Sequence, residues 1–276
     1  AWVLVFGAAL VLQRVAALGR GGLGAVMFSG VGVGIILAGL LTLAFQSAQR
    51  SSFEAWLALG ATALVLAALT WPAWRAGAEP RHSAVRPHPL AAARRSALLV
   101  ICYAALGFGY IVPATFLPVM AKAVVSDPAV FGWAWPVFGA AAAGSVLVSS
   151  RLAARFSDRS LWAGSHAVMA AGVALPAIVH GLVGIILSAV AVGATLMVAT
   201  LAAMQEARRI APAAAANLMA AMTSGFAIGQ IIGPVAAGVL VERLGSFSPA
   251  LWLAALALAA SAWALAARSG AKEDMP

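Results

Sequence analysis

Long apolar stretches separated by short polar segments recur along the whole chain. A helix needs about 20 apolar residues to cross the hydrocarbon core of a bilayer. We therefore predict an all-α integral membrane protein with nine transmembrane helices. The predicted helices cover residues 1–18, 23–46, 53–74, 96–121, 130–150, 161–180, 182–203, 213–241 and 249–267.

The first predicted helix is unusually short. Only twelve apolar residues precede Gln13 and Arg14. At 1.5 Å per residue they span about 18 Å, which is less than the apolar core of a bilayer. We expect this helix to lack its beginning.

Two of the predicted helices carry small residues at four-residue steps, and such residues share one helical face. Helices approach closely in lipid where their faces are bare, so we expect packing or gating contacts here. A proline in the later helix weakens it where a neighbouring helix could compensate. The residues are Gly30 and Gly34 in the earlier helix, and Gly225, Gly229 and Gly233, followed by Pro234, in the later one.

These two segments also match each other as an internal repeat. At an offset of 195 residues, Met27, Ser29 and Ile36 correspond to Met222, Ser224 and Ile231. Repeats within a membrane chain are typical of transporters built from two similar halves.

The composition supports a membrane protein and excludes a nucleic-acid-binding domain. Hydrophobic residues make up 63% of the chain and charged residues 9%, whereas soluble domains average about 25% charged residues. The net charge of +9 comes from Lys and Arg in short clusters between apolar stretches, not from one continuous basic surface.

The basic residues also predict how the chain is oriented. One set of alternate loops, with the C-terminal tail, holds fourteen Lys and Arg residues, and the other set holds only Arg50, Lys122 and Arg243. Because basic loops stay in the cytoplasm, we expect the C-terminus in the cytoplasm and residue 1 outside.

The longest polar segment, residues 75–95, divides the chain. We predict three helices of one bundle in 1–74, a basic cytoplasmic linker in 75–95, a six-helix bundle in 96–267 and a tail in 268–276. The linker arginines either fix the topology or contact anionic lipid.

The sequence shows no motif of a known enzyme class. All eight carboxylates fall at helix ends, in loops or in the tail, so no proton-coupling acid is evident. His166 and His180 lie near helix ends, where an interfacial role is favoured over a functional one. Glu206 and the arginines beside it form one compact cluster that has the pattern of a loop.

Polar and aromatic residues inside the predicted helices are the candidate solute contacts. Each has an alternative role in packing, in an interfacial aromatic belt, in bonding its own backbone or in bonding a neighbouring helix. Tyr103 and Tyr110 share one face of a helix that Pro113 and Pro118 interrupt. The complete set is Tyr103, Tyr110, Trp133, Thr195, Thr200 and Gln230.

Several motifs together resemble the major facilitator superfamily. They are the Ser-Gly-x3-Gly pairs at 29–34 and 224–229, the Gly-Gln-Ile-Ile-Gly-Pro run at 229–234 and the basic linker. The loop at 150–159 resembles a degenerate copy of the family's Gly-x-Leu-Ala-Asp-Arg-x-Gly-Arg-Arg motif, with Ala154 at the aspartate position. The run at 107–118 is similar to the YbfB/YjiJ-like bacterial permeases.

The resemblance implies a fold of twelve helices in two six-helix halves, of which this chain lacks the first three. The chain would then consist of three helices, the linker and six helices. The resemblance further implies that 1–18, 96–121 and 182–203 line the solute path, and that 23–46, 130–150 and 213–241 form the contact between halves. The helices at 53–74, 161–180 and 249–267 would lie outside.

We therefore predict a permease of the cytoplasmic membrane that moves a small organic solute by alternating access. The expected partners are the lipid bilayer, the solute and, as candidate coupling ion, a proton; neither a cofactor nor a metal is expected. The alternatives are a polytopic membrane protein without transport activity, such as an intramembrane enzyme or a scaffold, and an inactive truncated transporter.

Overall fold

A computed structural model describes residues 23–75, 90–125 and 132–267, with the single positions 7, 11 and 127. Within these ranges the chain forms eight long α-helices and one short 3-10 helix, η1. The α-helices are α2 (Leu23–Ser47), α3 (Ser52–Arg75), α4 (Leu90–Val124), α6 (Ala134–Leu152), α7 (Asp158–Ile178), α8 (Leu182–Ile210), α9 (Ala215–Leu244) and α10 (Ser248–Ala267). The helix η1 (Pro212–Ala214) precedes α9.

These eight helices match eight of the predicted segments. The predicted helix 1–18 apart from positions 7 and 11, most of the linker 75–95 and the tail 268–276 lie outside the described residues. Seven of the described helices are long and apolar enough to cross a membrane, and the apolar part of α6, Ala134–Ser149, is shorter.

Two helices extend furthest beyond their predicted ends. The helix α4 begins at Leu90 and α8 continues to Ile210. The added segments are rich in Ala, Arg, Met, Gln and Glu, which favour helix wherever the backbone can continue. Polarity marks where a helix leaves the apolar layer, whereas helical propensity decides where the helix ends.

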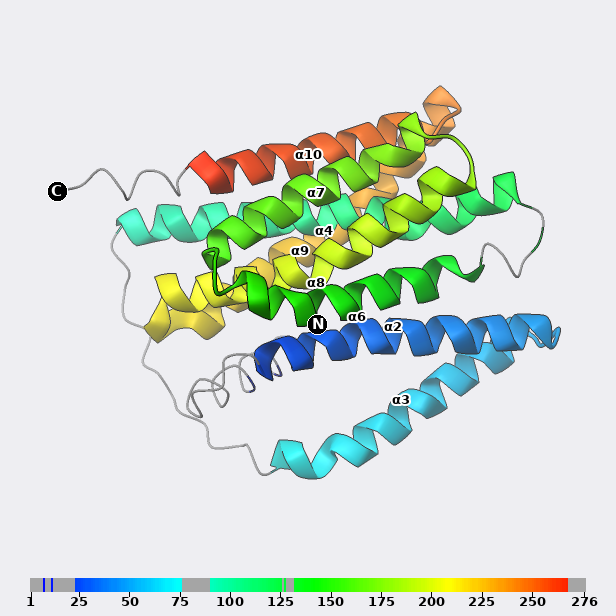
Figure 1. The fold of residues 1–276 in the computed structure, drawn as a ribbon, viewed down its shortest axis with the longest axis horizontal. Helices are drawn as coiled ribbons and strands as arrows, with labels where there is room; N and C mark the ends of the chain where they lie inside the picture. Colours follow the sequence, from blue (N-terminus) through cyan, green and yellow to red (C-terminus); the bar gives the residue numbers. More distant parts are fainter. Residues whose placement is uncertain are drawn as a thin grey trace.

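Successive helices run in opposite directions and lie side by side along one axis (Figure 1). The helices α4 and α6 to α10 form a bundle in which α4 packs on α9, α7 on α8 and α10, and α6 on α8. The helix α2 packs along α6, and α3 packs on α2. The apolar span of α3 has no fully buried residue, as expected of a helix that lies outside. The helices α7 and α10 were expected outside as well, but each buries about half of its apolar span.

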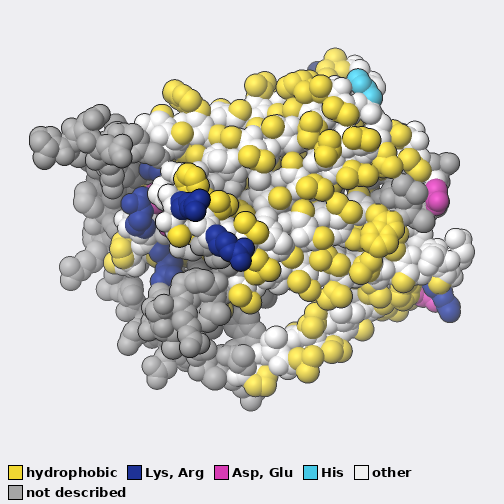
Figure 2. Space-filling view, viewed as in Figure 1, with side chains coloured by type: hydrophobic (Ala, Val, Ile, Leu, Met, Phe, Trp, Pro, Cys, Tyr) yellow, Lys and Arg dark blue, Asp and Glu magenta, His cyan; other side chains and the backbone are white. Residues whose placement is uncertain are grey.

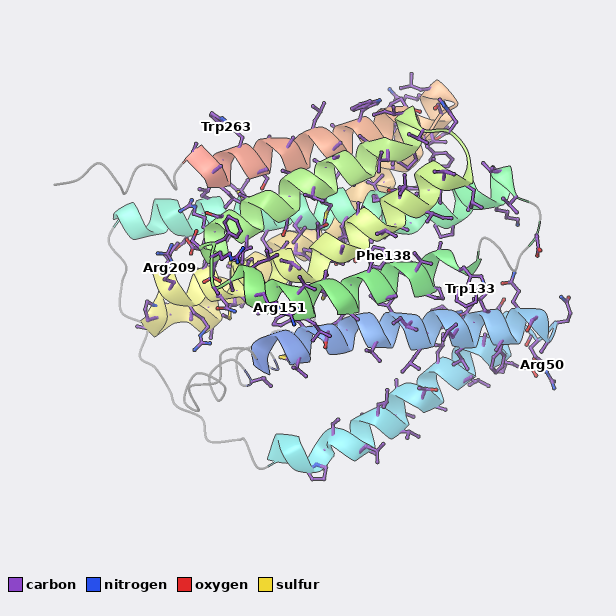
Figure 3. The ribbon with its side chains drawn as sticks, viewed as in Figure 1. Arg50, Trp133, Phe138, Arg151, Arg209 and Trp263 are labelled. Atoms are coloured by element: carbon purple, nitrogen blue, oxygen red, sulfur yellow. The ribbon has the colours of Figure 1, made fainter. Side chains whose placement is uncertain are left out.

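Charge and apolar surface are separated along this axis. On the face shown in Figure 2, hydrophobic side chains cover the middle of the molecule, and Lys and Arg gather mainly towards one end. Arg151 and Arg209 lie at that end and Arg50 at the opposite end (Figure 3). This is the surface expected of a bundle that crosses a bilayer.

Candidate functional site

Four aromatic side chains make a continuous series of ring contacts inside the bundle. Trp162 of α7 meets Tyr103 of α4 edge-on at 6.2 Å between ring centroids. Phe226 of α9 lies 5.2 Å from Tyr103 and stacks on Tyr110 at 5.5 Å with an interplanar angle of 12°. These separations suit favourable aromatic pairs. We call Trp162, Tyr103, Phe226 and Tyr110 the aromatic column.

The column ends at a hydrogen bond between two helices. Gln230 of α9 donates through Nε2 to the hydroxyl of Tyr110 on α4, at 2.7 Å. Both side chains are partly buried, and both residues lie near the middle of their helices. The structure thus joins two of the predicted solute contacts near the middle of two helices.

Tyr103 and the two threonines lie deeper in the bundle. Tyr103 is 1% exposed. Thr200 and Thr195 donate to backbone carbonyls of their own helix, Leu196 at 2.8 Å and Ala191 at 2.7 Å. The hydroxyls of both threonines are therefore engaged within α8.

Trp133 lies apart from this group. It is half exposed, immediately before α6, towards the end of the molecule that carries Arg50 (Figure 3). Near it, a small apolar crevice of about 220 Å³, including its open mouth, lies between α4, α6 and α8. Pro113, Leu117, Trp135 and Phe138 contribute to its lining.

The later glycine face packs against α4. Gly225, Gly229 and Gly233 are all buried. A Cβ on Gly229 would overlap the carbonyl oxygen of Ala104 and lie 2.7 Å from the backbone nitrogen of Phe108. Pro234 follows this face within α9 and is partly buried. The α4–α9 pair is therefore a backbone-to-backbone contact that tolerates almost no side chain at its centre.

The earlier glycines have a different environment. Gly30 and Gly34 lie on an exposed face of α2, and a Cβ on either would meet nothing within 4 Å. The close approach of α2 to α6 uses other glycines: a Cβ on Gly32 would lie 2.7 Å from the Gly139 carbonyl oxygen, and one on Gly39 2.7 Å from Pro136 Cδ. A packing role for Gly30 and Gly34 stays a prediction.

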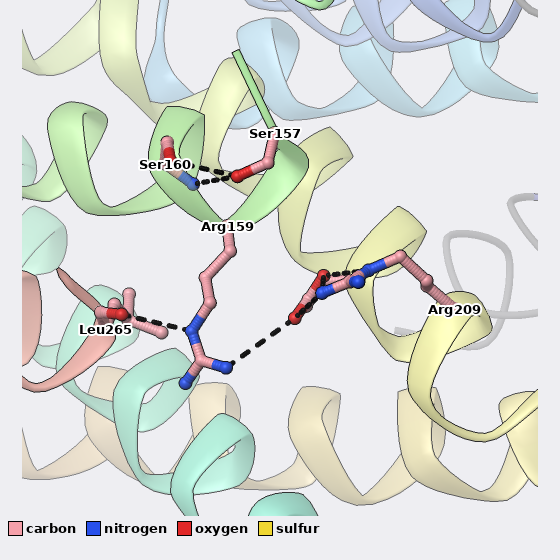
Figure 4. Close-up of polar contacts among 6 residues, drawn as sticks. Ser157, Arg159, Ser160, Arg209 and Leu265 are labelled. Carbon is pink, nitrogen blue, oxygen red and sulfur yellow. Dashed lines mark hydrogen bonds and ion pairs between the residues drawn. The ribbon is translucent and has the colours of Figure 1, made fainter. Parts of the chain in front are cut away.

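The expectation that Glu206 belongs to a loop was wrong. Glu206 lies within α8 and is fully buried. Arg209, one turn on, donates to both of its carboxylate oxygens at 2.8 Å. Arg159 of α7 approaches the same carboxylate at 3.8 Å and donates to the carbonyl of Leu265 on α10 at 3.0 Å (Figure 4).

This Glu206 cluster (Arg159, Glu206 and Arg209) joins α7, α8 and α10 at the arginine-rich end. Arg159 is the last residue of the motif-like loop at 150–159, so that loop does supply an ion pair although Ala154 stands at the aspartate position. The spacing of Glu206 and Arg209 was visible in the sequence, but the partner on another helix was not.

The interfacial expectation for His166 was also wrong, because this side chain is fully buried. It bonds Trp162 at 2.8 Å and Ser261 of α10 at 2.9 Å. His180, by contrast, is exposed beyond the end of α7. Among the described residues, no group of His, Cys, Asp and Glu is arranged to hold a metal ion.

The comparison with known protein families decides the family to which this helical bundle belongs. A family model described as "Uncharacterised MFS-type transporter YbfB" matches residues 1–266. The chain belongs to the YbfB-type branch of the major facilitator superfamily. No curated protein matches the chain.

Membership of this family makes the chain a multi-pass membrane protein of the transporter class. Among the described residues, the aromatic column and Gln230 are uncharged, lie between helices of the bundle and are joined by ring contacts and a hydrogen bond. They are therefore the candidate solute site.

Proposed function

We propose that the chain is a secondary transporter that moves a small, uncharged or amphipathic organic solute by alternating access. The hydrogen bond between Tyr110 and Gln230 carries this proposal. It pairs groups from α4 and α9 near the middle of both helices, beside the flat face of Phe226. Solute sites of transporters lie near the bilayer midplane between helices that move relative to one another.

The distribution of charge supports an uncharged or amphipathic solute. In the described ranges, the charged side chains lie in loops or near helix ends, away from Tyr110 and Gln230. A hydroxyl and an amide can exchange their mutual hydrogen bond for bonds to a solute, and Phe226 can cover an apolar part of it. A solute with both polar and apolar groups suits these side chains.

We further propose that the protein lies in the cytoplasmic membrane with its C-terminus inside, and we keep a proton as the candidate coupling ion. The basic bias of one set of loops supports the orientation. The part of the predicted linker between α3 and α4 would then lie in the cytoplasm. The glycine contacts of α2–α6 and α4–α9 would be the surfaces where helices slide or tilt.

Flux measurements in vesicles test the proposed function. Purified protein in liposomes should move an uncharged or amphipathic organic solute from a labelled panel faster than empty liposomes do. An imposed pH gradient should change the flux, and a protonophore should abolish that change.

Variants of the polar pair test the proposed site. Gln230→Leu should lower flux about tenfold, because loss of one buried hydrogen bond costs about 1–3 kcal/mol and each 1.4 kcal/mol is a factor of ten. Tyr110→Phe removes the other partner of the same hydrogen bond while keeping the ring, and should lower flux by a similar factor. Ser224→Ala is the control: Ser224 is exposed on α9 and bonds the Ala220 carbonyl of its own helix. Equal flux in Gln230→Leu and Ser224→Ala would exclude Gln230 as a solute contact.

A further inference from the structure

A buried polar cluster behind the aromatic column joins α7 to α10. Trp162 and His166 lie one turn apart on α7, and Ser261 faces them from α10. The indole nitrogen of Trp162 donates to His166 Nε2 at 2.8 Å, and His166 Nδ1 lies 2.9 Å from Ser261 Oγ. Trp162 and His166 have no exposed surface, and Ser261 has almost none.

The donors in this cluster fix the form of the imidazole ring. The indole N–H of Trp162 can only donate, so His166 Nε2 must accept and carries no proton. The single ring proton of a neutral histidine then lies on Nδ1, from where it is donated to Ser261 Oγ. The structure therefore assigns one tautomer to His166, with each ring nitrogen engaged on a different helix.

Trp162 connects this cluster to the proposed solute path. Its ring lies edge-on to Tyr103, and Tyr103 contacts Phe226, which stacks on Tyr110 beside Gln230. Trp162 is itself perpendicular to His166, with 5.8 Å between ring centroids and 89° between planes. His166 thus holds one side of the indole ring, and the other side of the ring contacts Tyr103.

We propose that His166 is a positioning residue for the solute path. Held by Ser261, it fixes Trp162 and so aligns the aromatic column, although it does not contact the solute itself. An apolar side chain could fill the same volume without a buried polar group that must be satisfied. Directional bonds to both neighbours provide the alignment that apolar packing would lack. The proposal rests on the column being part of the solute path.

The chain has only two tyrosines, Tyr103 and Tyr110, and both belong to the column. Labelling the full chain with 3-fluorotyrosine therefore places one fluorine probe at each of the two positions. Fluorine NMR of the protein in lipid nanodiscs gives two signals, which Tyr103→Phe and Tyr110→Phe assign. The measurement reports column geometry without a known solute.

His166→Leu should shift the signal of Tyr103 and, through Phe226, that of Tyr110. His166→Gln should restore both signals towards their original positions, because its amide offers an acceptor to Trp162 and a donor to Ser261. Ser261→Ala should shift the Tyr103 signal less, since Trp162 keeps its acceptor. His180→Leu changes the exposed histidine near the end of α7 and should shift neither signal.

Unchanged tyrosine signals in folded His166→Leu protein would overturn the proposal, and so would failure of His166→Gln to restore them. Where His166→Leu does not fold, Ser261→Ala decides: an unshifted Tyr103 signal there also overturns it. Shifted signals in a protein that moves no solute would preserve the positioning role and instead refute the proposed function.

Discussion

Glu206 is a carboxylate enclosed by the bundle, and two arginines from different positions in the chain bond it. Arg209 binds both carboxylate oxygens from the same helix, and Arg159 reaches it from α7. Bidentate arginine–carboxylate pairs are among the strongest hydrogen-bonded contacts in proteins. The Glu206 cluster should therefore hold the arginine-rich ends of α7, α8 and α10 in register.

Removal of the Glu206 charge should destabilise the folded protein. In Glu206→Gln, Arg159 would keep a side chain that is only 12% exposed but lose its carboxylate partner. Breaking one side of a buried pair costs about 3–5 kcal/mol. We expect a clearly lower midpoint of thermal unfolding in detergent.

The Arg50–Glu54 pair supplies a control for that measurement. Its side chains are 62% and 42% exposed, and exposed pairs contribute about 1 kcal/mol or less. Glu54→Gln should therefore leave the unfolding midpoint almost unchanged. A similar midpoint for Glu54→Gln and Glu206→Gln would show that burial of the cluster contributes nothing to stability.

The sequence predicted which residue types occupy the helices but not which of them meet. From the sequence, Gln230 was open to both a packing and a solute-binding interpretation. Its hydrogen bond joins it to Tyr110, a residue 120 positions earlier in the chain and on another helix. His166 was placed at the membrane interface because only its distance from a helix end was visible. In the structure, His166 bonds Ser261 of α10, which lies 95 positions later in the chain, so no local sequence pattern could predict this contact.

At the scale of whole helices, the four-residue spacing of small residues predicted the face of α9 that is buried against α4. The same spacing on α2 marks an exposed face among the described residues, because α2 meets α6 through Gly32 and Gly39 instead. Periodicity identifies a bare face, but only the neighbouring helix decides whether that face is covered. The ends of α4 and α8 were predicted less well because polarity was used in place of helical propensity.

These two environments predict opposite effects of the same substitution. Gly229→Ala would place a methyl group against the backbone of α4, and such overpacking costs about 1–3 kcal/mol. Gly30→Ala meets open space inside a helix, where replacing glycine gains roughly 0.5–1 kcal/mol. Thermal unfolding in one detergent should therefore show a lower midpoint for the first variant and an equal or higher one for the second. Equal losses in both would mean that the α4–α9 contact is not specific.

At the scale of the molecule, the helices alternate in direction along one axis, and the arginines gather mainly at one end of that axis. The connections α6–α7 and α8–α9 lie at the end that carries Arg151 and Arg209, whereas α2–α3, α7–α8 and α9–α10 are connected at the opposite end (Figures 1 and 3). This agreement could be predicted from the sequence because positive charge is sorted across the membrane independently of how the helices pack. Side-chain contacts between helices depend on packing and could not be predicted in that way.

Two introduced cysteines would measure the orientation of this axis. Ala48→Cys lies in the exposed turn between α2 and α3, and Arg155→Cys in the exposed turn between α6 and α7. A membrane-impermeant maleimide applied to intact spheroplasts should label Ala48→Cys, and should label Arg155→Cys only after the membrane is permeabilised. The native Cys102 is 1% exposed, so the chain without either substitution should remain unlabelled. Labelling of Arg155→Cys in sealed cells would reverse the proposed orientation and place the arginine-rich end outside, against the electrostatic bias that governs insertion.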